Sequence, residues 1–290
     1  MSASSAPSAG PSAAAPASSA ARFRVAALQM VSKPDLDANL ADAAALIAEA
    51  ARNGVQMVLL PEYFCLMGRH DSDKVAIRET PGDLANGVIQ RMLEESARTH
   101  RVWVVGGTLP LVAPEPERVL NTTLVFDPTG RQVARYDKIH LFSFSQGDQA
   151  FDESRTIRPG SAPTTFDAPF GRVGLSICYD LRFPELYRAF GDCALIVVPS
   201  AFTYTTGSAH WEILLRARAI ENQCYVLAAA QGGRHENGRR TWGHSMLIDP
   251  WGNIVAQREE GPGIVAGDID PQRIAEVRAS LPALGHRVIR

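Results

Sequence analysis

Apolar residues gather along this chain in short runs that alternate with longer segments of helical periodicity. In the first part of the chain, strands are predicted at residues 23–29, 55–60 and 102–109. Between them, residues 36–52 and 83–99 carry apolar side chains at helical spacing, which predicts two helices. Gly54 is placed to end the first helix, and Asp83 is a plausible N-cap for the second.

Polar turn residues change the pattern after residue 109. The segment Asp127-Pro-Thr-Gly130 lies between apolar stretches 122–126 and 132–136, which predicts a hairpin. A second hairpin is predicted at 243–249 and 254–257, around Pro250-Trp-Gly-Asn253. Further strands are predicted at 173–178, 194–199, 224–230 and 264–268, and further helices at 184–190, 209–222 and 271–279. This alternation predicts an α/β fold of mixed sheets covered by helices.

Composition restricts the class of protein. Residues 1–21 are nearly all Ala, Ser, Pro and Gly, so we expect a disordered tail before one domain at 22–290. The tail lacks the basic start and apolar stretch of an export signal, and no apolar run is long enough to span a membrane. The net charge of −2, without a long charged block, argues against nucleic acid or a membrane as partner. We therefore expect a cytoplasmic enzyme or binding protein.

The cysteines and histidines give no sign of a metal site or a disulfide framework. The four cysteines, Cys65, Cys178, Cys193 and Cys224, are scattered without a C-x-x-C pair, so reduced thiols are expected. The histidines have no metal-ligand spacing. No metal site is therefore predicted.

Cys178 stands at the end of the apolar run 173–178, and Pro184 suits the first turn of the helix that follows. A thiol at such a corner points out of the sheet, near helix N–H groups that favour a thiolate. A buried structural thiol is the usual alternative for a free cysteine. The corner placement and the polar residues after it favour a nucleophile.

Two other apolar runs also end in charged residues. Glu62 follows residues 55–60 and could be a general base that takes the thiol proton, or only a solvated loop residue. Lys138 follows the first hairpin and could stabilise an oxyanion. Glu153 could be a second carboxylate that holds Lys138 and an attacking water, or a turn cap. Arg182 could bind a substrate carboxylate through its planar fork, or pair with an acid for structure.

Three segments together resemble the signature blocks of the nitrilase superfamily of carbon–nitrogen hydrolases. They are Leu-Leu-Pro-Glu62-Tyr-Phe, Tyr-Asp-Lys138-Ile-His-Leu-Phe and Ser-Ile-Cys178-Tyr-Asp-Leu-Arg-Phe-Pro-Glu, and they come in the family's order. The resemblance implies a four-layer αββα sandwich with two mixed β-sheets. It also implies a catalytic triad of Glu62, Lys138 and Cys178, with Glu153 as the second glutamate, and no cofactor.

Later segments resemble the deaminated glutathione amidase branch of that family. They include Pro199-Ser-Ala-Phe202, Ala230-Gln-Gly-Gly-Arg-His235 and Trp242-Gly-His-Ser245. That branch hydrolyses the amide between a 2-oxoglutarate unit and Cys-Gly. The resemblance also implies a small-molecule amide substrate, a homodimer or higher homo-oligomer, and substrate contacts from a set of four residues. These are Tyr63, Tyr179, Arg182 and Phe202, with the Tyr179 N–H donating to the oxyanion.

Other functions stay open at this point. An omega-amidase acting on 2-oxoglutaramate, an N-carbamoyl amide hydrolase and a nitrilase belong to the same superfamily. Nitrilases usually carry Cys-Trp-Glu at the nucleophile, so the sequence Cys178-Tyr-Asp favours amides over nitriles. Two alternatives from other classes are a binding protein on the same fold and a redox-sensing thiol protein, which would need a second cysteine near Cys178.

Overall fold

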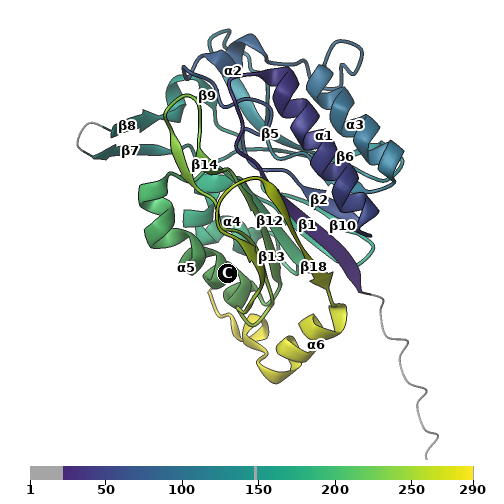
Figure 1. Cartoon of the computed structure of the whole chain (residues 1–290). Coiled ribbons are helices and arrows are strands. Elements are labelled where there is room, and N and C mark those ends of the chain that lie inside the picture. Colours follow the sequence, from purple (N-terminus) through teal and green to yellow (C-terminus); the bar gives the residue numbers. More distant parts are fainter. Residues whose placement is uncertain (1–21, 147–148, 290) are drawn as a thin grey trace, which may run out of the picture.

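A computed structural model describes residues 22–146 and 149–289 (Figure 1). The predicted disordered tail, residues 1–21, lies outside the described residues. The single domain predicted at 22–290 stays a prediction. None of the helices within the described ranges has the length and apolar character that crossing a membrane requires.

The first sheet has eight strands and contains both parallel and antiparallel pairs. Its main order is β18-β1-β2-β3-β5-β4, and β6 and β9 also pair with β5. The strands are β1 (Phe23–Gln29), β2 (Met57–Leu59), β3 (Trp103–Val105), β4 (Leu109–Val112), β5 (Val119–Phe126), β6 (Gln132–Asp137), β9 (Ile157–Arg158) and β18 (Gly263–Ile269). Strands β1, β2 and β3 run parallel, whereas β18 is antiparallel to β1. The sheet is therefore mixed, as the alternating pattern predicted.

The second sheet has six strands in the order β10-β11-β12-β13-β16-β17. They are β10 (Thr164–Ala168), β11 (Gly171–Leu175), β12 (Leu195–Ser200), β13 (Tyr225–Ala230), β16 (Ser245–Ile248) and β17 (Ile254–Arg258). Two small hairpins stand apart from both sheets, β7 (Ser143–Gln146) with β8 (Gln149–Asp152), and β14 (Gly232–Arg234) with β15 (Arg240–Trp242). Neither small hairpin was predicted from the sequence.

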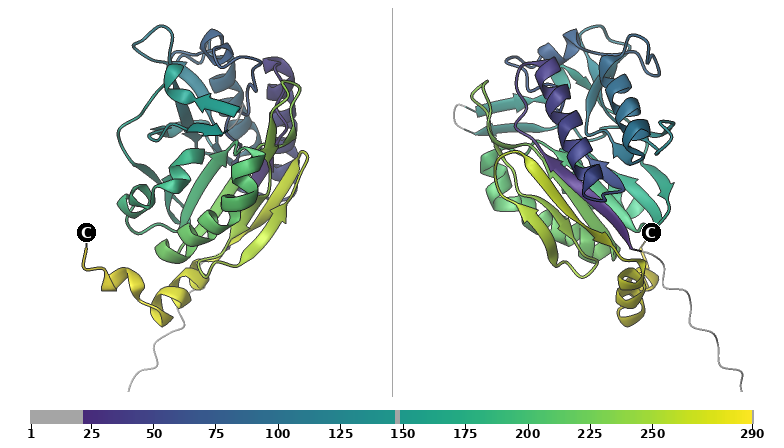
Figure 2. Two further views of the ribbon diagram at one scale, coloured as in Figure 1. Left: turned by 90° about the vertical axis from the view of Figure 1, so that its left-hand side faces the viewer. Right: turned by 45° about the vertical axis from the view of Figure 1, so that its right-hand side comes forward.

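The helices lie on the outer faces of the two sheets (Figures 1 and 2). Helices α1 (Leu36–Arg52) and α3 (Val88–His100) cover the first sheet, and α4 (Pro184–Ala189) and α5 (Tyr204–Asn222) cover the second. The remaining helical segments are α2 (Asp73–Ala76), α6 (Pro271–Ser280) and the 3-10 turns η1 (Glu153–Arg155), η2 (Cys178–Arg182) and η3 (Ala283–His286). The molecule is thus an α/β sandwich, which confirms the predicted fold class.

Alternation along β1 explains why the sheets pack as two inner layers. Val25 and Ala27 join a core that includes Val197 of the second sheet. Ala26 and Leu28, which point the other way, join a separate core with α1 and α3. Because successive strand residues face opposite sides, one apolar strand contributes to both cores.

Gly107 divides the strand predicted at 102–109 into β3 and β4. Its backbone has φ +50°, and a Cβ placed there would lie 2.2 Å from the Pro61 carbonyl oxygen. Only glycine allows such a close approach without displacing the neighbouring backbone. The break therefore brings the β3–β4 connection directly against the segment that carries Glu62.

The helix predicted at 83–99 instead begins at Val88, and Asp83 is not its cap. The Glu79 carboxylate accepts hydrogen bonds from the backbone N–H groups of Ile89 (2.6 Å) and Gln90 (3.0 Å). Asp83 accepts from Asn86 within the preceding turn. A carboxylate from outside the helix thus satisfies the free N–H groups at its start. The helix predicted from residue 209 also starts earlier, at Tyr204, where Thr203 caps it.

Candidate active site

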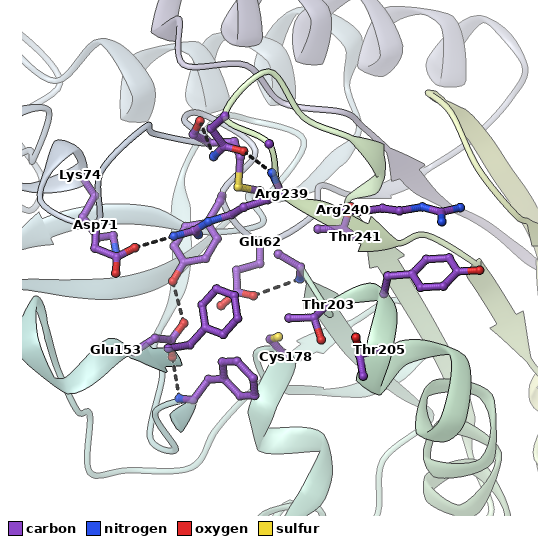
Figure 3. Close-up of a pocket in the computed structure, with 18 of the residues that line it drawn as sticks. Glu62, Asp71, Lys74, Glu153, Cys178, Thr203, Thr205, Arg239, Arg240 and Thr241 are labelled. Atoms are coloured by element: carbon purple, nitrogen blue, oxygen red, sulfur yellow. Dashed lines mark hydrogen bonds and ion pairs between the residues drawn. The ribbon is translucent and has the colours of Figure 1, made fainter. Parts of the chain in front are cut away.

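The structure brings together the four side chains that the sequence predicted to be catalytic. Figure 3 shows three of them, Glu62, Glu153 and Cys178. Glu62 lies three residues beyond β2, Lys138 follows β6 directly, and Cys178 follows β11 and opens η2. Glu153 opens η1, just after the β7–β8 hairpin. Both sheets therefore contribute to one site, although the four residues are far apart in the sequence.

The Lys138 ammonium group lies between two carboxylates. Its Nζ atom is 2.8 Å from Glu62 Oε1 and 2.8 Å from Glu153 Oε2. The side chain is fully buried. Burial alone would lower the pKa of Lys138, but the Glu153 and Glu62 carboxylates hold this pKa well above its ordinary value. Lys138 is therefore a permanent buried cation.

Gly160 fixes the backbone that carries this lysine. The Gly160 N–H donates to the Lys138 carbonyl oxygen at 2.8 Å. A Cβ at Gly160 would lie 2.2 Å from the carbonyl oxygen of Asp137, the residue before Lys138. As at Gly107, the missing side chain is what allows two backbone segments to touch beside a site residue.

The Glu62 carboxylate is also held from two other directions. Asn121 Nδ2 donates to Oε1 at 3.0 Å, and the Ala201 N–H donates to Oε2 at 3.0 Å. Burial raises the pKa of Glu62, Lys138 lowers it, and the charge of Glu153 raises it, so that the pKa stays above the ordinary carboxyl value. A carboxylate with a raised pKa is a stronger proton acceptor, which suits a general base.

Glu153 is the more acidic of the two carboxylates. It accepts from the Tyr63 hydroxyl at 2.7 Å and from the Phe142 N–H at 2.7 Å, in addition to its pair with Lys138. Burial would raise the pKa of Glu153, but Lys138 and these hydrogen bonds hold it below the ordinary value. Tyr63 keeps its proton, because burial and the neighbouring carboxylates raise its pKa well above normal.

Cys178 has a left-handed backbone, with φ 49°, at the corner between β11 and η2. The expected thiolate is not what this environment favours. Burial and the Glu62 carboxylate raise the pKa of the Cys178 thiol well above its ordinary value, and they outweigh Lys138. The resting residue is therefore a neutral thiol beside a carboxylate base, which is the arrangement of a nucleophile activated by proton transfer.

Asp180 anchors the corner that presents Cys178, and the sequence reasoning missed it. Its carboxylate accepts from the Tyr136 hydroxyl (2.7 Å), the Ile177 N–H (2.9 Å) and the His140 N–H (3.0 Å). The His140 ring also lies within hydrogen-bond distance, at 2.7 Å. Asp180 is fully buried, so these contacts tie η2 to the segment around Lys138.

Two cavities meet at Cys178. The larger, of about 520 Å³, is lined by Glu62, Tyr63, Glu153 and Cys178, and also by residues of the β7–β8 and β14–β15 hairpins. The smaller, of about 20 Å³, is lined by Cys178, Tyr179, Arg182 and Phe202, among others. The predicted substrate-binding residues thus divide between the cavities, with Tyr63 in the larger and the other three in the smaller.

Arg182 lies between aromatic rings and beside a histidine. Its guanidinium carbon is 5.7 Å from the centre of the Tyr179 ring and 5.5 Å from that of Phe202. Its Nη1 atom is 3.3 Å from His210 Nδ1. Over residues 22–146 and 149–289, no salt bridge joins Arg182 to a carboxylate. The predicted alternative of a structural pair with an acid therefore finds no partner there.

The larger cavity also contains residues that the sequence did not single out. Lys74, Asp71 and Arg239 line it and come from loops and short elements that carry no motif. Asn121, on β5, could have been noticed only as a polar residue within an apolar strand. Within the part of the chain that the structure describes, no group of His, Cys, Asp or Glu side chains is arranged to hold a metal ion.

Comparison with known sequences agrees with this geometry. The sequence model of the family described as carbon-nitrogen hydrolase matches residues 24–279. The chain is 43% identical over 272 residues to the deaminated glutathione amidase of Synechocystis sp., which covers 92% of this chain and 98% of the relative. It is 38% identical over 263 residues to human omega-amidase NIT2, covering 90% of this chain and 93% of the relative.

Solved structures share the fold. Nit3 of Saccharomyces cerevisiae, a member of the nitrilase superfamily, has a TM-score of 0.81 and 32% identity, over 90% of this chain and 94% of that one. A variant of the amidase of Nesterenkonia sp. AN1, with acrylamide added to its active-site cysteine, has a TM-score of 0.73 and 28% identity, over 90% and 98%. Because the family model and the relatives extend over nearly the whole chain, the protein belongs to the carbon–nitrogen hydrolase family, within the nitrilase superfamily, and is a hydrolase of carbon–nitrogen bonds other than peptide bonds.

Proposed function

We propose that this protein is a cysteine-dependent amidase whose substrate is deaminated glutathione. The observation that carries the reaction is the Lys138 ammonium group, buried between Glu62 and Glu153, whose side chains line the cavity that contains Cys178. These groups supply a nucleophile, a base and a fixed positive charge. The similarity to the deaminated glutathione amidase of Synechocystis sp. supports the choice of substrate.

In the first step, Glu62 takes the proton of Cys178 as the sulfur attacks the amide carbon. The new C–S bond forms as the carbonyl oxygen becomes an oxyanion, which accepts from Lys138 and from the Tyr179 N–H. An ammonium group has three N–H donors, and in this structure Lys138 Nζ contacts Glu62 Oε1 and both oxygens of Glu153. One N–H therefore turns from Glu153 to the oxyanion as its charge develops. Glu62 then passes its proton to the nitrogen as the C–N bond breaks, which releases the amine and leaves a thioester.

In the second step, water replaces the amine. Glu62, assisted by Glu153, removes a proton from the water as the water oxygen attacks the thioester carbon. The C–S bond breaks, the thiolate recovers a proton from Glu62, and the acid is released. Each turnover thus consumes one amide and one water and restores the neutral thiol.

The positive charge of Arg182 supports a substrate whose acyl group carries a carboxylate. Arg182 lines the smaller cavity beside Cys178, and its planar guanidinium suits a carboxylate. The second candidate is an omega-amidase, which the similarity to human omega-amidase favours; it would release ammonia instead of Cys-Gly. A redox-sensing role is not favoured, because within the described ranges neither cavity beside Cys178 is lined by a second cysteine.

Mass spectrometry of the intact protein mixed with deaminated glutathione tests the proposal. We expect a transient 2-oxoglutaryl adduct on Cys178, and release of Cys-Gly into solution. An adduct together with ammonia released from 2-oxoglutaramate, but no reaction of deaminated glutathione, would favour the omega-amidase instead. The absence of an adduct and of product with every amide tested would refute the amidase assignment.

We also propose that the protein forms a homodimer through the outer face of α5. Ile213 and Ile220 are 70% and 50% exposed and lie two turns apart on one face of that helix. Trp251, which is 51% exposed, adds to the patch beside Ile220. An Ile213→Asp substitution should shift the sedimentation coefficient to that of a monomer.

The four unpaired buried cysteines support a reducing compartment such as the cytoplasm.

A further inference from the structure

A cationic group lines one end of the larger cavity, away from Thr203 and Thr205 (Figure 3). Arg239 Nη2 lies 2.6 Å from Asp71 Oδ1, and its guanidinium carbon is 5.7 Å from the centre of the Phe151 ring. These two contacts fix the plane of the guanidinium. The guanidinium has five N–H donors, and among the described residues Asp71 is the acceptor of one of them, which leaves the others for a ligand.

Lys74 supplies a second cation at the same end. Its Nζ atom donates to Thr156 Oγ1 at 3.3 Å and lies 5.4 Å from the centre of the Tyr63 ring. In the part of the chain that the structure describes, no carboxylate oxygen lies within 4 Å of it. Lys74 and Arg239 thus place two basic side chains at this end of the cavity, and Arg239 is the one that pairs with Asp71.

The position of Glu62 decides which part of the substrate would reach this end. Glu62 lines the larger cavity, whereas the described walls of the smaller cavity contain Arg182 but not Glu62. In the proposed mechanism Glu62 gives its proton to the departing nitrogen. In that mechanism the amine therefore leaves on the side of the larger cavity, which Glu62 lines.

We propose that Arg239 and Lys74 form a carboxylate subsite for the leaving group, which is a short peptide amine with a free C-terminal carboxylate. This inference rests on the proposed amidase function and identifies the residues that would make a peptide-bearing substrate preferable to a primary amide. A volume of about 520 Å³ is within the range of small-molecule sites and leaves room for a dipeptide.

Three substrates that differ only beyond the scissile nitrogen test the subsite. They are deaminated glutathione, the same compound with a C-terminal carboxamide, and 2-oxoglutaramate, which releases ammonia. The wild-type protein should prefer the free acid over the carboxamide by about 10- to 100-fold in kcat/KM, the factor that corresponds to a charge-assisted hydrogen bond. Arg239→Gln should remove this preference by raising KM for the free acid, with far less effect on the other two substrates.

Arg240→Gln is the matched control. Arg240 neighbours Arg239 and also lines the larger cavity. Its guanidinium, however, pairs with Glu260 at 2.8 Å and lies 3.7 Å from the centre of the Tyr204 ring, which directs it away from Cys178. The Arg240→Gln variant should prefer the free acid over the carboxamide as strongly as the wild type does. Lys74→Met should reduce the preference in the same direction as Arg239→Gln, and Arg239→Lys should restore part of it.

Calorimetric binding to the inactive Cys178→Ala protein separates this subsite from the proposed activity. If that protein binds deaminated glutathione and loses affinity with Arg239→Gln, the subsite stands even where the wild type shows no turnover of this compound. If the wild type hydrolyses the free acid and the carboxamide equally well, or Arg239→Gln weakens both equally, the subsite is refuted while the amidase function stands. Absence of binding and of turnover would refute both.

Discussion

The reaction centre and the outer wall of the cavity are built in opposite ways. Lys138 and Glu62 are 0% and 1% exposed and are fixed by short ion pairs and backbone donors. Arg239 and Asp71, on the outer wall, are 36% and 52% exposed and rest on one ion pair between two loops. Breaking a buried pair costs far more stability than breaking an exposed one. The chemistry is therefore rigidly fixed, while the choice of leaving group depends on residues that can change at little cost to folding.

The largest effect should come from the nucleophile. Cys178→Ser keeps the size of the side chain but replaces the thiol by a much weaker nucleophile, so turnover should fall by about 10⁴-fold or more. The folded state should be nearly unaffected, because no ion pair is lost. Amide hydrolysis and thermal unfolding measure the two quantities. A soluble Cys178→Ser protein with full activity would exclude Cys178 as the nucleophile.

Lys138→Met tests whether the buried ion network supports both catalysis and folding. Loss of an oxyanion donor should lower kcat by about 10²- to 10³-fold. Because Glu62 and Glu153 would remain buried without their cation, the free energy of unfolding should fall by about 3–5 kcal/mol. Turnover assays and urea unfolding measure these changes.

Lys33→Met is the matched control for that substitution. The Lys33 side chain pairs with Asp42, and the two are 41% and 54% exposed. Its removal should change stability by less than about 1 kcal/mol. Equal losses of stability in Lys138→Met and Lys33→Met would contradict the expected difference between buried and exposed ion pairs.

Glu153→Gln should lower activity by about 10- to 100-fold, the scale of a misplaced reactant. The charge of Glu153 raises the pKa of Glu62, so its removal should lower that pKa. Glu62 must be ionised to act as the base, and the acid limb of the kcat/KM–pH profile should therefore move to lower pH. A limb that moves to higher pH would show that Glu62 does not control it.

The smallest effect should come from Arg182, the residue proposed to bind the acyl carboxylate. Arg182→Ala should raise KM for carboxylate-bearing substrates by about tenfold while kcat changes little, since a charge-assisted contact with the bound acid is lost. Initial rates with 2-oxoglutaramate and with an amide that lacks the carboxylate provide the comparison. If KM for the acid does not change, Arg182 is not a binding residue.

The sequence predicted the reaction centre better than the walls around it. Glu62, Lys138 and Cys178 each follow an apolar or strand-forming run within a short recognisable segment, so local pattern was enough. Asp180 lies in the same segment as Cys178, but its partners Tyr136 and His140 are distant in sequence, and no local signal indicates that a carboxylate will be buried there.

The outer wall and the small hairpins had no such signal. Arg239 and Asp71 are separated by 168 residues and meet only because two loops converge. The strands of the β7–β8 and β14–β15 hairpins are short and, in the described part of the chain, belong to neither large sheet. They therefore lack the long apolar alternation that marks a sheet strand. The α3 helix was predicted too long, because the residue that caps it, Glu79, acts from outside the helix.

Gly107 and Gly160 extend the number of positions at which activity can be lost. Each touches the backbone just before a reacting residue, Pro61 in one case and Asp137 in the other. Even a methyl group at either position would push that backbone aside and carry Glu62 or Lys138 with it. A genetic screen for inactive enzymes should therefore recover alanine at two positions that have no functional group, and a catalogue of chemical roles would leave both of them out.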